Sequence, residues 1–236
     1  MQITTVLFDL DGTLLPMDQK HFVMTYLQYL AAYLVPYGYD PKVVSEAIWA
    51  GTGAMVKNDG AARNDEVFWK VFESFCGEGA RKDEPIFQKF YETRFQDVAR
   101  VCGHDPRAAE AIAAIKAKGL RVALATNPLF PAIATESRIR WAGLKPEDFE
   151  LYTTYETCRF CKPNLDYYRE VLEKLGVQPE ECLMVGNDAG EDMITEQLGM
   201  KTFLLTDSLI DRGLDITRWH RGSFPELLNY IDSLSR

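Results

Sequence analysis

The apolar positions of the chain follow two different patterns, and the change between them falls near residue 103. A short apolar run at 3–8 has the composition and length of a buried strand. The stretch that follows has apolar residues at helical spacing and no alternating strand pattern. It predicts four helices, at about 19–35, 41–57, 65–76 and 84–101. Asp40 is the expected N-cap of the second helix, with Pro41 at its first position, and Asn64 is the expected N-cap of the third.

After residue 103, short apolar runs alternate with helical segments. We expect strands at about 120–125, 150–154, 182–185 and 201–205. We expect helices at about 106–118, 132–142, 163–175, 190–198 and 224–234. Strands that alternate with helices indicate a parallel sheet covered on both faces. The sequence therefore predicts an α/β fold, with a doubly wound parallel sheet as the core domain (1–16 and 103–236) and an all-helical domain inserted at 17–102.

Charge and hydropathy narrow the range of partners. The net charge of −9 and the pI of about 4.9 argue against nucleic acid, because such binding depends on Lys and Arg neutralising phosphates. No apolar run approaches the length of a membrane span, and the first residues do not have the pattern of a signal peptide. We therefore expect a cytoplasmic protein with no membrane partner. The oligomeric state is left open by the sequence.

The cysteines favour reduced thiols over a metal or disulfide framework. There are five, which is an odd number, and no secretion signal accompanies them. Cys158 and Cys161 have CxxC spacing, which is also found in zinc sites and redox pairs. No second CxxC and no paired histidines complete a zinc site, so we interpret the two as unpaired thiols.

Two carboxylates follow the first strand, and they give the first indication of chemistry. Asp9 ends the apolar run, Asp11 comes two residues later, and Gly12 permits a sharp turn. Buried strands seldom end in two acids, because unpaired buried charge is costly. Two carboxylates held together suit a hard cation such as Mg2+, and one of them can attack phosphorus.

Polar residues also end two later strands of the predicted sheet. Thr126 and Asn127 follow the strand at 120–125, Asp188 follows the strand at 182–185, and Lys162 precedes a helix between them. Each has an ordinary explanation alone, as a strand end, a helix cap or a solvated side chain. Ligands of doubly wound sheets bind beyond the carboxyl ends of the strands, however. A hydroxyl, an ammonium group and carboxylates gathered there suit a metal-bound phosphoryl group.

The segment Asp9-Leu10-Asp11-Gly12-Thr13 resembles the DxDGT motif of the haloacid dehalogenase (HAD) superfamily, whose commonest members are phosphatases. Thr126, then Lys162 with its following proline, then the pair Asp188 and Asp192 resemble the remaining motifs in the same order. The resemblance covers about 1–16 and 103–210 and implies a Rossmann-like core, whereas 17–102 matches the cap of the family only in position and helical character. Asn187 departs from the family pattern, which often has Gly and Asp adjacent.

The resemblance implies a Mg2+-dependent phosphatase that hydrolyses a small phosphorylated metabolite. Asp9 would form an aspartyl-phosphate, and Asp11 would act as general acid and then as general base. The metal would be held by Asp9, the backbone carbonyl of Asp11, and Asp188, while Asp192 would orient water or Lys162. The phosphoryl group would be bound by Thr126, Asn127 and Lys162. Family members that dehalogenate lack the second acid, so Asp11 favours phosphoryl chemistry.

Three other functions remain open, and the substrate is not indicated. A sugar-phosphate mutase of the same superfamily would return the phosphoryl group to its substrate. A phosphonate hydrolase would need a lysine of the cap, for which Lys20 and Lys57 are candidates. A phospho-receiver module also combines acids, a threonine and a lysine around Mg2+, but it has no helical insertion and does not turn over. We expect His21 and Arg63 to be solvated, and Trp49 and Trp69 to belong to the core of the cap.

Overall fold

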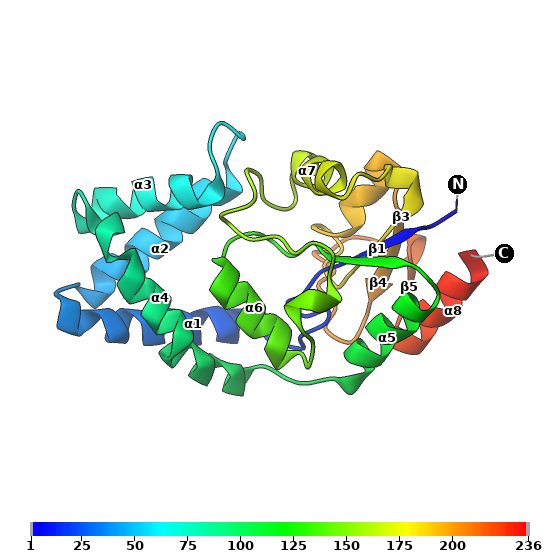
Figure 1. Cartoon of the computed structure of the whole chain (residues 1–236), viewed down its shortest axis with the longest axis horizontal. Coiled ribbons are helices and arrows are strands. Elements are labelled where there is room, and N and C mark those ends of the chain that lie inside the picture. The colour runs from blue at the N-terminus through cyan, green and yellow to red at the C-terminus, as the bar shows by residue number, and fades with distance from the viewer. Residues whose placement is uncertain (1, 235–236) are drawn as a thin grey trace.

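The computed structural model describes residues 2–234, and this part of the chain contains one five-stranded sheet (Figure 1). Its strands are β1 (Thr5–Phe8), β2 (Arg121–Leu124), β3 (Cys182–Gly186), β4 (Lys201–Leu205) and β5 (His220–Gly222). They lie in the order β2-β1-β3-β4-β5, and every neighbouring pair is parallel. The predicted α/β class with a parallel sheet is confirmed.

Helices cover both faces of the sheet because alternate side chains of each strand point to opposite faces. Val6 and Phe8 of β1 pack in a cluster with α5 (Pro106–Ala117) and α8 (Phe224–Leu234). Leu7, between them in the sequence, packs in a different cluster with α7 (Leu165–Leu175) on the opposite face. Burial on both faces explains why these strands are almost entirely apolar.

The regular elements between β1 and α5 are all helical, and they lie at the end of the molecule away from both termini (Figure 1). They are α1 (Gln19–Leu34), α2 (Pro41–Val56), α3 (Asn64–Cys76) and α4 (Glu84–Glu92), with 3₁₀ segments at Val35–Tyr37, Ala80–Asp83 and Arg94–Val101. Their buried faces share one aromatic cluster, separate from the clusters on the sheet. In Figure 1, α6 (Ala132–Trp141) lies between these helices and the sheet.

One predicted N-cap is confirmed, and the other is wrong. The Asp40 side chain accepts hydrogen bonds from the backbone N–H groups of residues 42 and 43. At the start of α5, Asp105 accepts one from residue 107 in the same way. Asn64 lies inside α3 instead, because its side-chain amide donates to the Phe160 carbonyl and to Cys161 Sγ. Asn64 thus joins the helical insertion to the segment before α7.

Several boundaries differ from those predicted. The expected helix at 84–101 ends at Glu92 and continues after Thr93 as a 3₁₀ segment. The expected strand at 150–154 is reduced to a single bridge between Tyr152 and Leu124. The expected helix at 190–198 is a 3₁₀ segment at Met193–Leu198. Further 3₁₀ segments occur at Pro146–Asp148, Pro179–Glu181 and Ile216–Arg218.

The strand order determines where a ligand would bind. The chain passes from β1 to β2 on one side and then to β3 on the other, so the order reverses around β1. In sheets of this order the ligand crevice lies beyond the carboxyl ends of β1 and β3. Asp9 directly follows β1, and Asp188 lies two residues beyond the end of β3. None of the helices within residues 2–234 combines the length and apolar composition that crossing a membrane requires.

Candidate active site

The sequence-predicted residues surround one cavity of about 170 Å3 at the carboxyl ends of the strands. The sheet side of its wall contains Asp9, Asp11, Thr126, Asn127, Asp188 and Asp192. The opposite wall comes from the start of the helical insertion, at Met17, Gln19, Phe22 and Val23. Lys162 is not part of the wall and lies directly behind Asp9. Residues far apart in the sequence therefore meet between the sheet and the inserted helices.

The turn after β1 brings Asp9 and Asp11 to this cavity. Gly12 has φ of 84°, a conformation that side chains with a β-carbon seldom adopt. A β-carbon at this position would also lie 2.3 Å from Asn187 Nδ2. Both observations confirm that glycine is needed for the sharp turn.

Lys162 holds two carboxylates from inside the protein. Its ammonium donates to Asp9 Oδ1 at 2.8 Å and to Asp192 Oδ1 at 2.6 Å, and the residue is 1% exposed. Burial by itself lowers the pKa of Lys162, but Asp192 and Asp9 outweigh it and raise that pKa well above its ordinary value. Lys162 is therefore a permanent cation beside Asp9.

Asp192 connects this ion pair to the end of β3. Its Oδ2 accepts a hydrogen bond from the backbone N–H of Asp188 at 3.1 Å. Burial raises the pKa of Asp192 to about 7, although Lys162 opposes the rise. A β-carbon on Gly186 would lie 2.0 Å from Asp192 Oδ2, so glycine at the end of β3 makes room for this carboxylate.

The other oxygen of Asp9 is held by Thr13. The Thr13 hydroxyl lies 3.0 Å from Asp9 Oδ2 and 3.1 Å from Asn187 Oδ1. The Asn187 amide in turn donates to the Ser208 carbonyl at 2.6 Å. Because Lys162 and Thr13 hold opposite oxygens, the orientation of the Asp9 carboxylate is fixed. Asn187, which departs from the family motif, thus supports Asp9 while Asp188 lies against the same cavity.

Asp11 is paired with Arg138 of α6, a contact that the sequence did not predict. Arg138 Nη1 donates to Asp11 Oδ2, and the arginine is fully buried with its guanidinium 4.4 Å from the centre of the Phe130 ring. Asp11 Oδ1 is buried and has no hydrogen-bond partner. Burial raises the pKa of Asp11 above its ordinary value, and Arg138 opposes that rise. No local pattern around Arg138 distinguishes it from the exposed Arg140.

Asp188 is paired with Arg212, a second contact that the sequence did not predict. Arg212 Nε lies 2.6 Å from Oδ1 and 2.9 Å from Oδ2 of Asp188. The same guanidinium lies 2.9 Å from Glu191 Oε1. Glu191 also faces the cavity, and burial raises the pKa of its carboxyl. Arg212 thus offsets the charge of two acids at the cavity edge.

Thr126 and Asn127 follow β2 and line the same cavity as Asp188. The Thr126 carbonyl accepts hydrogen bonds from the Thr153 hydroxyl at 2.6 Å and the Tyr167 hydroxyl at 2.8 Å, which fix the end of β2. The Asn127 amide oxygen accepts from the backbone N–H of Lys162 at 3.3 Å, and its nitrogen donates to Glu191 at 3.3 Å.

The donor atoms at the cavity are compatible with a hard cation. Within residues 2–234, no three His, Cys, Asp or Glu side chains form a group that could hold a metal. The expected ligands are two carboxylates, Asp9 and Asp188, and one backbone carbonyl, so they do not require such a group. All are oxygen donors, which Mg2+ prefers, and the unpartnered Asp11 Oδ1 leaves a further acceptor buried beside them. The residues present fit Mg2+.

The remaining candidates lie away from this cavity. Lys20, His21 and Lys57 are exposed, and Arg63 is paired with Asp65. Cys158 and Cys161 are buried free thiols, and burial raises the pKa of both. Trp69 is buried, as expected, but Trp49 is 54% exposed, so its prediction as a core residue is wrong.

Comparison with known proteins identifies one family of hydrolases. The family model described as haloacid dehalogenase-like hydrolase matches residues 3–195. Pyrophosphatase PpaX of Bacillus cereus is 26% identical over 212 residues, which cover 90% of this chain and 87% of that protein. Glyceraldehyde 3-phosphate phosphatase of Methanothermobacter thermautotrophicus is 27% identical over 121 residues, 48% of this chain and 52% of that protein. The crystal structure of 2-haloacid dehalogenase from Pseudomonas syringae superposes with a TM-score of 0.62 at 19% identity, covering 98% of both chains.

Proposed function

The chain belongs to the haloacid dehalogenase-like hydrolase family, and from this premise we propose that it is a Mg2+-dependent phosphatase acting on a small phosphorylated metabolite. The observation that carries the proposal is the arrangement of Asp9 and Asp11. One carboxylate is held at both oxygens by Lys162 and Thr13, and the other lies beside the same cavity with one oxygen unpartnered. The first suits a nucleophile of fixed orientation, and the second suits an acid–base group.

In the first step, an Asp9 carboxylate oxygen attacks phosphorus while the bond to the alcohol oxygen breaks. Asp11 gives its proton to that leaving oxygen. The raised pKa of Asp11 favours the protonated form needed here, and burial is its main cause. The products of this step are the free alcohol and an aspartyl-phosphate on Asp9.

In the second step, the Asp11 carboxylate takes a proton from water, and the water oxygen attacks phosphorus. The bond to Asp9 breaks, phosphate leaves, and both acids return to their starting forms. Arg138 supports this step because its positive charge favours the Asp11 carboxylate. Burial and Arg138 therefore act on opposite protonation states of the same residue, each needed once in the cycle.

The charge of the phosphoryl group would be offset by Lys162, with hydrogen bonds from Thr126 and Asn127. Mg2+, held by Asp9, the carbonyl of Asp11 and Asp188, would offset further negative charge. Asp192 holds Lys162 in place at 2.6 Å. We also propose that 1–16 and 103–236 form the core domain and 17–102 the cap, because the inserted helices supply the wall facing Asp9.

The test is phosphate release from a panel of sugar phosphates, phospho-acids, nucleotides and aryl phosphates, with and without Mg2+. We expect release that stops on chelation and returns with Mg2+. Asp9→Asn should abolish it, and mass spectrometry of acid-quenched Asp11→Asn should find one phosphoryl group on the peptide containing Asp9. Undiminished activity after chelation, or a label on another residue, would contradict the proposal.

A further inference from the structure

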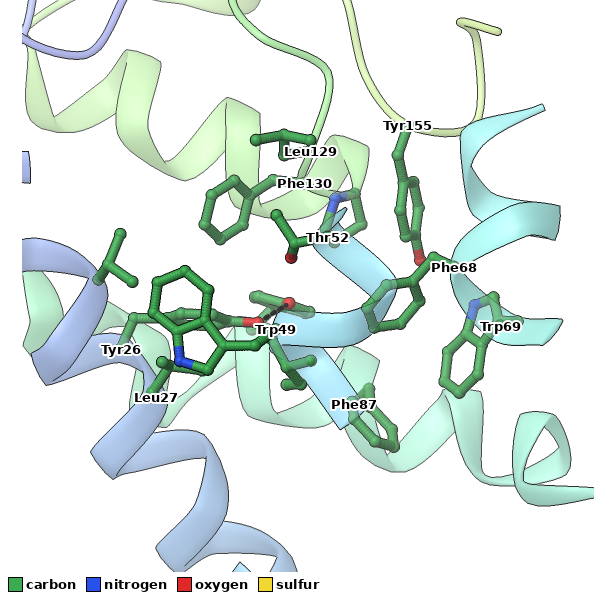
Figure 2. A pocket seen from close by; sticks show the side chains of 14 residues that line it. Tyr26, Leu27, Trp49, Thr52, Phe68, Trp69, Phe87, Leu129, Phe130 and Tyr155 are labelled. Atoms are coloured by element: carbon green, nitrogen blue, oxygen red, sulfur yellow. Dashed lines mark hydrogen bonds between the residues drawn. The ribbon is translucent and has the colours of Figure 1, made fainter. Parts of the chain in front are cut away.

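A second cavity, of about 180 Å3, lies among the inserted helices (Figure 2). We call it the cap chamber. It adjoins the cavity at Asp9, which we call the catalytic cavity. The two cavities share Val23, Leu129 and Phe130 in their walls, so they are direct neighbours. Figure 2 shows that the side chains of the cap chamber come from α1, α2, α3 and α4, from the loop before α6, and from Tyr155 after α6.

The walls of the cap chamber are aromatic and carry no charge. No acidic or basic side chain is among the residues of 2–234 that line it. Phe130 and Tyr26 meet edge to face with ring centres 5.2 Å apart, and Phe68 and Trp69 do so at 5.6 Å. Such walls favour an apolar guest and give a charged one nothing to pair with.

The few polar atoms of the chamber are neutral. The Tyr26 and Tyr91 hydroxyls lie 2.9 Å apart and satisfy one another, and burial raises the pKa of Tyr26 to about 12. The indole N–H of Trp69 lies near the Tyr155 phenol but is buried without a hydrogen bond of ordinary geometry. The polar atoms of the chamber wall are thus hydroxyl and indole groups without charge.

We propose that the cap chamber binds the leaving alcohol of the substrate, and that this alcohol is uncharged and carries an apolar group about the size of one aromatic ring. The inference rests on the phosphatase function proposed above and specifies its substrate class. A cavity of about 150 Å3 lined by apolar side chains accommodates benzene, so a chamber of about 180 Å3 is large enough for one substituted ring. Pyrophosphate, nucleotides and phospho-acids would place further charge where no cation lines the wall.

The first test measures binding and does not depend on turnover. Benzylphosphonate and ethylphosphonate carry the same phosphonate head group, resist hydrolysis and differ by one ring. With Mg2+ present, calorimetry on the wild-type protein should find benzylphosphonate bound about 10- to 100-fold more tightly, which is the gain expected from burying one ring. Equal affinities, or tighter binding of pyrophosphate than of benzylphosphonate, would overturn the proposal.

A variant that fills the chamber tests its location. Thr52 is half-buried in α2 and lines the chamber but not the catalytic cavity. Thr52→Trp should remove most of the preference for the ring and leave ethylphosphonate binding unchanged, which also shows that the variant is folded. Thr52→Val, similar in volume to threonine, should keep the preference. An undiminished preference in a folded Thr52→Trp protein would place the ring elsewhere and overturn the proposal.

Turnover separates this inference from the proposed function. Benzyl phosphate and ethyl phosphate both have alkoxide leaving groups, and we expect the ratio of their kcat/KM values to follow the ratio of phosphonate affinities. If benzylphosphonate binds selectively but neither ester is hydrolysed, the phosphatase function is wrong and the chamber assignment stands. If both esters are hydrolysed at equal kcat/KM, the phosphatase function stands and the chamber assignment is wrong.

Discussion

Arg138 shows how one residue of α6 can influence the proton affinity of Asp11, the proposed catalytic acid. Its guanidinium favours the ionised form of Asp11, whereas burial favours the protonated form and raises the pKa. The aromatic face of Phe130 lies against the guanidinium and limits its access to water. These two effects together determine the pKa of Asp11, and a substitution of Arg138 would change it.

We predict that Arg138→Gln moves the high-pH limb of kcat/KM to higher pH. Asp11 must be protonated for the first step, so kcat/KM falls as the pH rises through the pKa of Asp11. Removing the cation destabilises the carboxylate, which raises that pKa further. The measurement is a pH–rate profile, and Arg140→Gln is the control because Arg140 is exposed and paired with Glu136. A limb that stays in place or moves to lower pH would contradict the role assigned to Arg138.

Arg212 acts on a different acid of the cavity. It holds both oxygens of Asp188, one of the proposed metal ligands, and its own side chain is 46% exposed. A cation at Asp188 must share those oxygens with the guanidinium or displace it. Arg212 is therefore expected to weaken Mg2+ binding as well as to offset the charge of Asp188.

We predict that Arg212→Gln lowers the Mg2+ concentration required for half-maximal activity by about 2- to 5-fold, since the pair is open to water on the side of Arg212. Calorimetric titration with Mg2+ should show the same change in affinity. Arg218→Gln is the control, because Arg218 forms an exposed ion pair with Glu196 instead. A higher Mg2+ requirement in Arg212→Gln would mean that Arg212 orients Asp188 for the metal.

At the scale of elements, the end of β3 depends on a glycine. Gly186 is the last residue of the strand, and the Asp192 carboxylate occupies the space where a side chain would begin. Gly53, in the last turn of α2, has open space around the same position. The same substitution, glycine to alanine, can therefore be compared at a crowded position and at an open one.

We predict that Gly186→Ala destabilises the protein by about 1–3 kcal/mol, as overpacking of an interior does, and sharply lowers kcat. The new methyl group would push Asp192 away from Lys162 and so disturb the cation beside Asp9. Gly53→Ala should instead stabilise by about 0.5–1 kcal/mol, because alanine is favoured over glycine in helices. Urea unfolding and steady-state kinetics measure both effects, and a neutral Gly186→Ala would show that Asp192 can move without consequence.

Elements with strong local patterns were predictable from the sequence, and elements that depend on distant contacts were not. The apolar run of β1 and the helical pattern of α5 are local signals, and both elements were predicted. β5 was missed because its three residues, His220–Gly222, have no strand composition and form a strand only beside β4. The helix predicted at 84–101 was interrupted at Thr93, where tertiary packing outweighs helical periodicity.

The candidate site divides in the same way. Four site residues could be proposed from the sequence, because each lies next to a predicted element and the motifs follow the order found in the family. They are Asp9, Asp11, Lys162 and Asp188. Thr13 was part of the first motif, but its contact with Asp9 depends on the turn geometry. Arg138 and Arg212 could not be found, since each pairs with an acid distant in the sequence and no spacing rule connects them. The cap chamber is lined by residues from several helices and a loop, so no single segment of the sequence predicts it.

At the scale of the whole molecule, two connections join the inserted helices to the sheet, and they run side by side. Met17 and Cys102 form an antiparallel bridge, and the backbone N–H of Gly103 donates to the Pro16 carbonyl at 2.6 Å. All four residues lie at the predicted boundaries of the cap, 16–17 and 102–103. If the inserted helices move relative to the sheet, the backbone of these two connections must change conformation.

The pair can be locked chemically, because residues opposite one another in an antiparallel bridge have Cα atoms about 4.5–5.5 Å apart, within the range that a disulfide spans. We predict that Met17→Cys, oxidised to join Cys102, lowers kcat, since substrate entry or product release requires the two connections to move. Dithiothreitol should restore the rate. Met17 lines the catalytic cavity, so the reduced variant is the reference, and the wild-type protein treated with the same oxidant controls for the other thiols. Mass spectrometry would verify the 17–102 linkage, and a linked protein with the kcat of its reduced form would show that turnover needs no movement of the inserted helices about these connections.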